Sequence, residues 1–338
     1  MSLNFETIDF ITADGITCNL KHLIQKGSSP KGPVLLVHGA GVRANIFNAP
    51  TQKNIIEVLA EDGYDVWLEN WRASIDLKPR PWNLDEAALN DHPAAVRKIV
   101  ELTGCQEMKA IIHCQGSTSF MISAVLGLVP QVKTIISNAV SLHPVVPNFS
   151  VFKLNVILPV VKLITDDLNP AWGLKAIDLK SRLFRLLVRL THWEKDTFVG
   201  KFVSFTYGAG FPALWRLENL DRKTMDWIQY EFASVPTKFF DQIRKCVHRG
   251  VLVPADSASG KTYADEEPKT DARFIFFGGE YNLCFKPQSQ ANSFNYFNQI
   301  TPGRHKFYLI KGYSHLDIFL GKNAHEDIFP LMLKELNT

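Results

Sequence analysis

The sequence predicts an α/β fold in which a mostly parallel sheet carries helices on both faces. Short apolar runs of strand length, such as 33–38 and 64–69, alternate with amphipathic segments of helical length, which is the pattern of strands joined by crossover helices. The alternation stops near residue 143 and resumes near residue 271. Between these points the sequence predicts short helices and loops, so a helical segment is inserted into the sheet domain.

The elements follow from local signals taken in order. Two strands joined by the hairpin signal Thr12-Ala-Asp-Gly15 open the chain. Apolar runs of buried-strand type follow. The expected strands cover 6–11, 16–24, 33–38, 64–69, 109–113, 132–140, 273–277 and 305–310, and the expected helices cover 51–62, 84–103, 116–128, 287–300 and 324–336. Pro93 lies inside the second helix and predicts a kink or a second helix start there.

The domain boundaries are set by the inserted segment. We expect residues 1–142 and 271–338 to form one core and residues 143–270 to form a helical lid. The insertion contains four tryptophans (Trp172, Trp193, Trp215 and Trp227) and several phenylalanines. Apolar residues of this kind, placed between sheet strands, suit a lid over a lipophilic pocket. A helical packing domain with no role in binding is the alternative.

The stretch 109–119, Lys-Ala-Ile-Ile-His-Cys-Gln-Gly-Ser-Thr-Ser, predicts a strand, an abrupt turn at Cys114 and a helix. This is the context of the nucleophile elbow, a Gly-x-Ser-x-Gly turn that lifts a nucleophile above an α/β-hydrolase sheet. Gly116 supplies the small residue that the turn needs after the nucleophile, whereas Ile112 replaces the small residue before it. Cys114 stands where the serine would be. His113, the second residue of the turn, is expected to face away from the nucleophile.

A nucleophile of this type needs a base and groups that stabilise an oxyanion. His315 lies in a loop after the last expected strand, which is where hydrolases of this fold place their histidine. The glycine-rich turn after the strand 33–38 brings a backbone amide close to the nucleophile. Taken alone, this stretch is equally consistent with an oxyanion-binding turn and with a plain glycine turn.

The residue that orients the histidine is the open point of the predicted site. It should follow the strand 273–277, but no aspartate occurs in the stretch 277–284. Asn282 has a suitable offset, and an asparagine orients the imidazole of Cys–His–Asn proteases. Glu280 is the second candidate because it carries a charge. Asp317 is close to His315 in sequence, so a solvated or capping role is expected for it.

At these motifs the sequence resembles the gastric and lysosomal acid lipase family of α/β-hydrolases. The matching stretches are Asp62–Asn70, Leu84–Ala87, Asp91–Ala94, His113–Ser117 and His315–Gly321. The stretches Gly312–Asp317 and Gly321–Ala324 are also similar to hydrolase-like segments associated with cholesterol-oxidase-type (GMC) flavoenzymes. The resemblance implies an α/β-hydrolase fold, Cys114 as nucleophile, His315 as base, and the amides of Ala40 and Gln115 as oxyanion hole.

Cysteine in place of serine favours chemistry through a thioester. A cysteine paired with histidine forms a thiolate readily, and the resulting acyl-enzyme can pass its acyl group to water, alcohols, thiols or amines. We therefore expect acyl transfer, or ester or thioester hydrolysis, on a lipophilic or carrier-bound acyl substrate. The alternative is an inactive hydrolase fold that binds a lipid or a partner protein.

Composition narrows the class of partners. The net charge of +3 over 338 residues argues against nucleic acid. The five cysteines are scattered and odd in number, with no metal-type spacing, so we expect a reducing compartment and neither a metal nor another cofactor. The first residues show no signal-peptide pattern, which leads us to expect a cytoplasmic protein. We also expect transient contact with a membrane surface, while the oligomeric state stays open.

Overall fold

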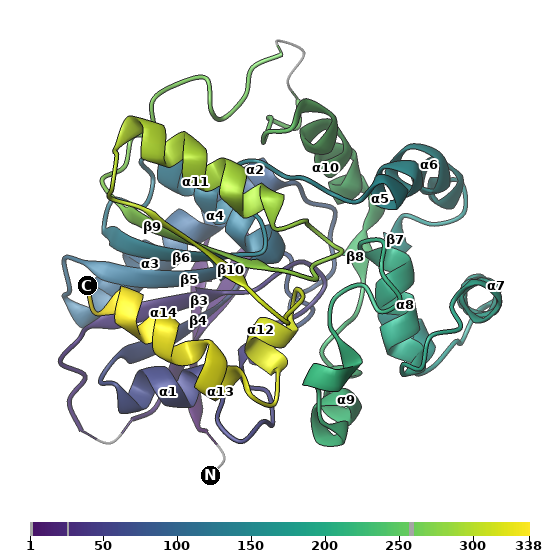
Figure 1. Ribbon diagram of the computed structural model, residues 1–338, viewed down its shortest axis with the longest axis horizontal. Helices are drawn as coiled ribbons and strands as arrows, with labels where there is room; N and C mark the ends of the chain where they lie inside the picture. The colour runs from purple at the N-terminus through teal and green to yellow at the C-terminus, as the bar shows by residue number, and fades with distance from the viewer. Residues whose placement is uncertain (1–2, 26, 257–259) are drawn as a thin grey trace.

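The computed structural model describes residues 3–25, 27–256 and 260–338, and an eight-stranded sheet forms its centre (Figure 1). The order of the strands across the sheet is β1-β2-β4-β3-β5-β6-β9-β10. Their bounds are β1 Phe5–Ile11, β2 Thr17–Leu23, β3 Pro33–Val37, β4 Asp65–Asn70, β5 Met108–His113, β6 Val132–Asn138, β9 Arg273–Gly279 and β10 Lys306–Ile310. From β4 to β10 all neighbours are parallel, whereas β1 pairs with β2, and β2 with β4, in the antiparallel sense. The prediction of a mostly parallel α/β sheet is therefore confirmed.

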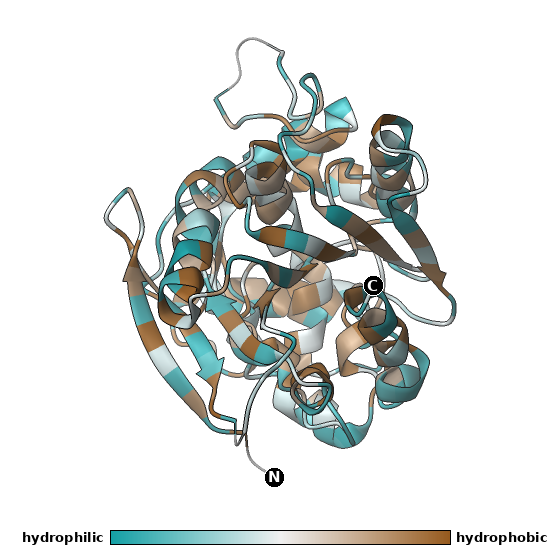
Figure 2. Ribbon diagram, turned by 90° about the vertical axis from the view of Figure 1, so that its left-hand side faces the viewer, coloured by the Kyte–Doolittle hydropathy of each residue, from teal (hydrophilic) through white to brown (hydrophobic). Residues whose placement is uncertain are grey.

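Burial explains why the central strands read as continuous apolar runs. Helices cover both faces of a parallel sheet, so both sides of each strand must be apolar. All five residues of β3 are buried, as are the last four of β5. The edge hairpin β1–β2 is different, because hydrophilic and hydrophobic residues alternate along it near the N-terminus (Figure 2).

Helices flank the sheet in two layers (Figure 1). Helices α1 (Ile55–Glu61) and α14 (Phe329–Leu336) cover one face, and α3 (His92–Thr103), α4 (Cys114–Val125) and α11 (Gln288–Ile300) cover the other. The side chains of Asn54 and Glu57 form a capping box that fixes the start of α1. Two short helices, α12 (Asp317–Leu320) and α13 (Ala324–Asp327), lead into α14.

The helix expected over 84–103 is present and contains a π-helical turn. It consists of α2 (Leu84–Glu86), a π-helical turn η2 (Ala87–Asp91) and α3. Pro93 lies in the first turn of α3. Glu86, Asp91 and His92 all have helical backbone angles, so the helical path is continuous, and the π-helical turn just before Pro93 accommodates the proline. The irregularity predicted at Pro93 is therefore present as a π-helical turn and not as a second helix start.

The inserted segment forms a cap beside the carboxyl ends of the central strands (Figure 1). Its helices are α5 (Asn148–Phe152), a π-helical turn η3 (Lys153–Ile157), α6 (Leu158–Lys162), α7 (Leu179–Thr191), α8 (Phe198–Thr206), α9 (Arg222–Ile228) and α10 (Thr237–Arg249). Its two short strands, β7 (Asp167–Leu168) and β8 (Val235–Pro236), pair with each other. Within the described part of residues 143–270, no strand joins the main sheet. None of the helices described combines the length and the apolarity needed to cross a bilayer.

Candidate active site

Cys114 occupies a strained turn between β5 and α4. Its backbone φ is +55°, a conformation that L-residues other than glycine rarely adopt. In the described residues only one other non-glycine residue, Ala139, has a positive φ. Strain of this kind persists only where the surrounding structure enforces it, and it concentrates at functional sites. The conformation is that of a nucleophile elbow, so the sharp turn predicted at Cys114 is present.

Two glycines allow the elbow to pack. A Cβ atom on Gly116 would lie 2.2 Å from the carbonyl oxygen of His38. A Cβ atom on Gly39 would lie 2.9 Å from the Cβ atom of Cys114. The loop after β3 and the start of α4 therefore touch through backbone atoms. Ile112 is accommodated because its side chain is buried inside the sheet, where its backbone pairs with Val37. The turn therefore forms without a small residue at position 112.

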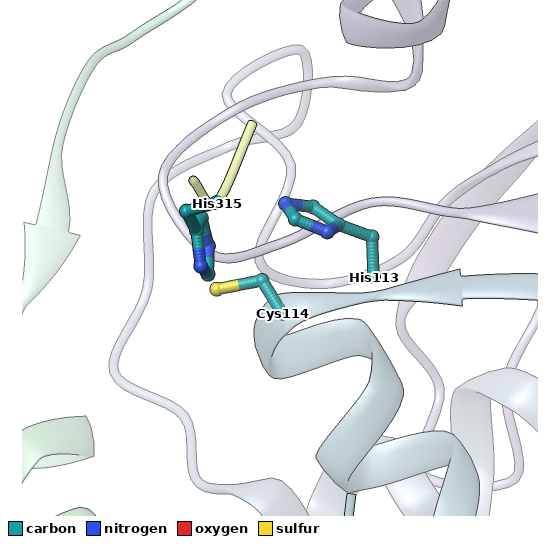
Figure 3. A group of neighbouring side chains, drawn as sticks. All are labelled: His113, Cys114 and His315. Atoms are coloured by element: carbon teal, nitrogen blue, oxygen red, sulfur yellow. The ribbon is translucent and has the colours of Figure 1, made fainter. Parts of the chain in front are cut away.

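The sulfur of Cys114 points toward the imidazole of His315, and His113 lies beside both (Figure 3). One donor atom from each of the three side chains lies within 4.8 Å of the other two. The rings of His113 and His315 are 4.7 Å apart between centroids. The expectation that His113 faces away is wrong, because the ring folds back toward His315 and is held there by a 2.8 Å hydrogen bond from Asn138 Nδ2 to His113 Nδ1.

The surroundings of Cys114 favour its thiolate. A hydrogen bond with the Cys284 thiol, together with the nearby His315 imidazole and the amide of Gln115, holds the pKa of Cys114 well below its ordinary value, although burial opposes the shift. The same hydrogen bond and burial raise the pKa of Cys284 well above its ordinary value. Cys114 is the more acidic of the two, since it alone begins a helix and contacts the imidazole. Cys284 thus acts as a donor to the Cys114 sulfur.

Of the two predicted oxyanion-hole residues, Gln115 lies beside the sulfur, and Ala40 lies in the turn that packs against Cys114 through Gly39. The amide of Gln115 is in the first turn of α4, where amides lack helical partners, and it contributes to the low pKa of Cys114. Ala40 follows Gly39, which packs against Cys114. The hydroxyl of Tyr207, from the cap, donates a 3.1 Å hydrogen bond to the carbonyl of Ala40 and fixes this turn.

Neither predicted orienting residue hydrogen bonds to His315, so this part of the predicted site needs correction. The Oδ1 atom of Asn282 accepts hydrogen bonds from the amides of Cys284 and Phe285, at 3.0 and 3.1 Å, and therefore shapes its own loop. Glu280 is exposed and accepts a 2.9 Å hydrogen bond from the Gly312 amide. Among the residues that the structure describes, His315 Nδ1 has no hydrogen-bond partner although it is buried.

Asp317 has the expected capping role, but it is fully buried rather than solvated. It accepts hydrogen bonds from the amides of Ser314 and Arg216 and from the side chain of Asn219. Burial raises the pKa of Asp317 to about 6. Asp317 therefore holds the loop that carries His315 and does not contact the imidazole.

A largely apolar cavity opens at the sulfur. Its volume is about 80 Å³, and both Cys114 and Cys284 lie in its wall. Most of the remaining wall comes from the cap. The apolar lining consists of Val146, Leu154, Ile157, Leu158, Val161, Leu168, Phe205, Phe239, Phe240, Ile243 and Phe285. The arrangement suits an acyl chain whose carbonyl reaches the sulfur.

Comparison with known proteins agrees with this geometry. A family model described as alpha/beta hydrolase fold matches residues 32–322, which is most of the chain. The chain belongs to the α/β hydrolase fold family. A crystal structure of a monoacylglycerol lipase from Paleococcus ferrophilus superposes with a TM-score of 0.56 at 16% identity, covering 99% of this chain and 98% of that one. At this identity the superposition supports the fold.

Two curated relatives of this α/β hydrolase are lipases. Lipase member K of Mus musculus is 36% identical over 134 residues, which are 34% of this chain and 33% of that protein. Human gastric triacylglycerol lipase is 30% identical over 131 residues, 33% of each chain. The matched segments therefore span about one third of these relatives. The resemblance to the acid lipase family is confirmed, whereas the similarity to flavoenzyme-associated segments stays a prediction.

His113, Cys114 and His315 are also the group in the described residues whose donor atoms could hold a metal ion. Zinc bound there would have three protein ligands and an open position. It would also occupy the sulfur that the elbow presents to the cavity.

A second hydrolase-like arrangement lies elsewhere in the α/β hydrolase core. Glu69 accepts from His92 Nδ1 at 2.9 Å, and His92 Nε2 lies 2.7 Å from the hydroxyl of Ser119. All three side chains are fully buried, and none of them lines a cavity described for the molecule. This acid–histidine–serine chain joins β4, α3 and α4 and has no access for a substrate.

Sequence reasoning missed three residues of the site: Cys284, Tyr207 and Lys153. Cys284 lies at the end of the stretch searched for an acid, and its hydrogen bond to Cys114 depends on how that loop folds. Tyr207 and Lys153 belong to the cap, whose packing on the core no local pattern reveals. A partial signal existed for Lys153, because it interrupts the apolar run 151–164.

Proposed function

We propose that this α/β hydrolase transfers or hydrolyses acyl groups through a thioester on Cys114. The observation that carries the proposal is the sulfur of Cys114, which lies at a strained elbow, faces His315 and opens on an apolar cavity. The fold family and the lipase relatives support hydrolase chemistry, and the cysteine makes it thiolate chemistry.

The reaction divides into two steps. The Cys114 thiolate attacks the carbonyl carbon of an ester or thioester, and the carbonyl oxygen becomes an oxyanion next to the amides of Gln115 and Ala40. When the tetrahedral intermediate collapses, the leaving oxygen or sulfur takes a proton from the His315 imidazolium. Water or another acceptor then gives its proton to His315 and attacks the thioester, which releases the Cys114 thiolate again.

The unpartnered Nδ1 of His315 supports a thiolate mechanism rather than a serine-type one. A serine hydroxyl loses its proton only during attack, and the histidine that takes it depends on a carboxylate for orientation and charge. A thiolate–imidazolium pair has already transferred the proton before attack, so it depends less on that carboxylate. The low pKa of Cys114 and the missing orienting acid are parts of the same chemistry.

The substrate is proposed to be a lipophilic acyl ester or thioester, free or bound to a carrier, and the cap is proposed to act as its lid. The outer face of the cap supports delivery from a lipid surface. Helix α7 carries four basic residues and no acidic one, and its exposed side chains include Leu179 at 85% and Leu190 at 60%. A basic helix with outward leucines binds the surface of anionic membranes.

Alkylation and acyl trapping, each on its own sample, test the proposal. We expect iodoacetamide at neutral pH to modify Cys114 before the other four cysteines, as mapped by peptide mass spectrometry. Brief incubation of a separate, unalkylated sample with a medium-chain thioester should give a mass increase of one acyl group on Cys114. An inactive fold that binds a lipid would bind the chain without forming this covalent adduct, which would refute the proposed function.

A further inference from the structure

Lys153 brings a charge into the apolar cavity. In the described wall of the cavity it is the only lysine, arginine, aspartate or glutamate, and it lies in the same wall as Cys114 and Cys284. Charged groups are costly to bury unless they are paired. The cost of burying the Lys153 ammonium is explained if a bound substrate brings an opposite charge into the cavity.

Lys153 lies on the cavity side of its helix and not on the solvent side. A lysine on a surface helix normally extends its amine to water and lays its methylenes over apolar neighbours. Here the neighbouring Phe152 and Val156 are exposed at 47% and 48%, while the lysine lines the cavity. Lys153 begins the π-helical turn η3. Such turns shift the face of a helix and occur frequently at functional sites.

The amine is held in place and keeps one donor free. Its Nζ atom donates to the carbonyl oxygens of Ser204 and Gly208, both at 3.0 Å. An ammonium group has three N–H donors, so one remains. No carboxylate is among the charged groups that act on it in the described residues, and burial lowers the pKa of Lys153 to about 8, which leaves it mostly protonated at neutral pH.

We propose that Lys153 binds an acidic group of the substrate, a carboxylate or a phosphate, inside the cavity. The substrate class thereby narrows from lipophilic acyl compounds to amphiphilic ones that carry one acidic group together with the apolar chain. The single free donor matches a single oxyanion oxygen. This inference deepens the proposed function and rests on it for the acyl chemistry, but the acid-binding site itself does not require turnover.

A structural role is the competing explanation. Ser204 lies in the last turn of α8, where a lysine satisfies free carbonyls and interacts favourably with the helix dipole. That role would make Lys153 important for stability and indifferent to the charge of the ligand. The experiment therefore has to vary the charge of the ligand and that of the residue together.

Binding provides the first test. Nonanoate, nonyl phosphate and the neutral nonanamide are titrated by calorimetry into the wild type, Lys153→Gln and Lys153→Met. We expect at least one of the two anions to bind the wild type about 10-fold or more tighter than the amide. The stronger of the two anions identifies the acidic group. In both variants the anions and the amide should bind with about equal affinity.

Lys162→Met is the matched control, because Lys162 lies on the same lid segment and pairs with Asp241 outside the cavity. It should keep the wild-type preference. Lys153→Gln retains hydrogen-bond donors toward Ser204 and Gly208, so it removes the charge even if Lys153→Met does not fold. An absent preference in the wild type, or one that survives in Lys153→Gln, overturns the inference.

Turnover provides the second test and separates the two proposals. The N-acetylcysteamine thioester of nonanedioic acid should exceed that of nonanoic acid about 10-fold in kcat/KM, and Lys153→Gln should abolish the difference. Equal turnover of both thioesters by the wild type overturns the inference and leaves the proposed function standing. If the wild type prefers the anions in binding but turns over neither thioester, the acid-binding site stands and the proposed acyl chemistry is overturned.

Discussion

Replacing Cys114 with serine should remove most of the activity, although serine is the usual nucleophile of this fold. His315 Nδ1 has no hydrogen-bond partner in the described residues, and Asn282 and Glu280 bind elsewhere. The histidine would then have to activate a hydroxyl without an orienting carboxylate. Removing that carboxylate from a serine triad lowers turnover about 10⁴-fold.

The expected loss in Cys114→Ser is therefore about 10³- to 10⁴-fold in kcat. Stopped-flow or end-point release of N-acetylcysteamine from its nonanoyl thioester measures it, with Cys114→Ala defining the background. Cys105→Ser is the matched control, because Cys105 is a partly exposed free cysteine outside the cavity and its replacement should leave turnover unchanged. Wild-type turnover by Cys114→Ser would refute the reasoning and would indicate that a carboxylate, such as Glu280 in the stretch where the acid was expected, reaches His315 during catalysis.

Three further outcomes are expected. The low pKa of Cys114 keeps its thiolate present at pH values where an ordinary thiol is protonated, so alkylation by iodoacetamide should persist from pH 8 down to about pH 6. In Cys284→Ala, which lacks the hydrogen bond to the sulfur, the alkylation rate should fall as the pH is lowered over that range, and an unchanged profile would contradict the assigned role of Cys284. Gly116→Ala should lower the free energy of unfolding by about 1–3 kcal/mol in urea titrations, because its Cβ would lie 2.2 Å from the carbonyl of His38; an unchanged midpoint would show that the elbow can relax. Leu186→Asp on the outer face of α7 should weaken binding to anionic vesicles about tenfold, whereas Leu102→Asp on α3 should not, and equal losses in both would remove α7 from the lipid-binding surface.

The sequence was sufficient for the sheet and the elbow because both depend on local patterns. Runs such as 33–38 are apolar on both faces only in a covered parallel strand, and a strand–turn–helix with Gly116 two residues after Cys114 fixes the turn. The order of nucleophile and histidine along the chain then singled out His315. Each of these inferences needs only neighbouring residues and the topology of the fold.

The orienting residue and the cap contacts could not be predicted in the same way. Asn282 had a suitable offset, but its side chain caps its own loop, and this choice depends on backbone amides that become available only after folding. His113 turns toward His315 because Asn138, on the adjacent strand, donates to its ring. Lys153 reaches the cavity through a π-helical turn, which leaves no periodic signal in the sequence.

The cap is joined to the loops that carry the reacting groups. Besides the bond from Tyr207 to Ala40, the Ala233 amide donates to the carbonyl of Gly41 at 3.1 Å, and Arg43 pairs with Glu231 at 2.8 Å. On the opposite side, the Leu316 amide, next to His315, donates to the carbonyl of Leu214 at 2.8 Å.

These bonds bear on how such proteins diversify. A cap exchanged between two members of the family would bring its own partners for the oxyanion turn and for the histidine loop, so chemistry and chain selectivity would change together. Chimeras that keep Tyr207, Leu214 and Glu231 while replacing the cavity wall between them are therefore the ones expected to retain a working nucleophile with a new preference for substrate.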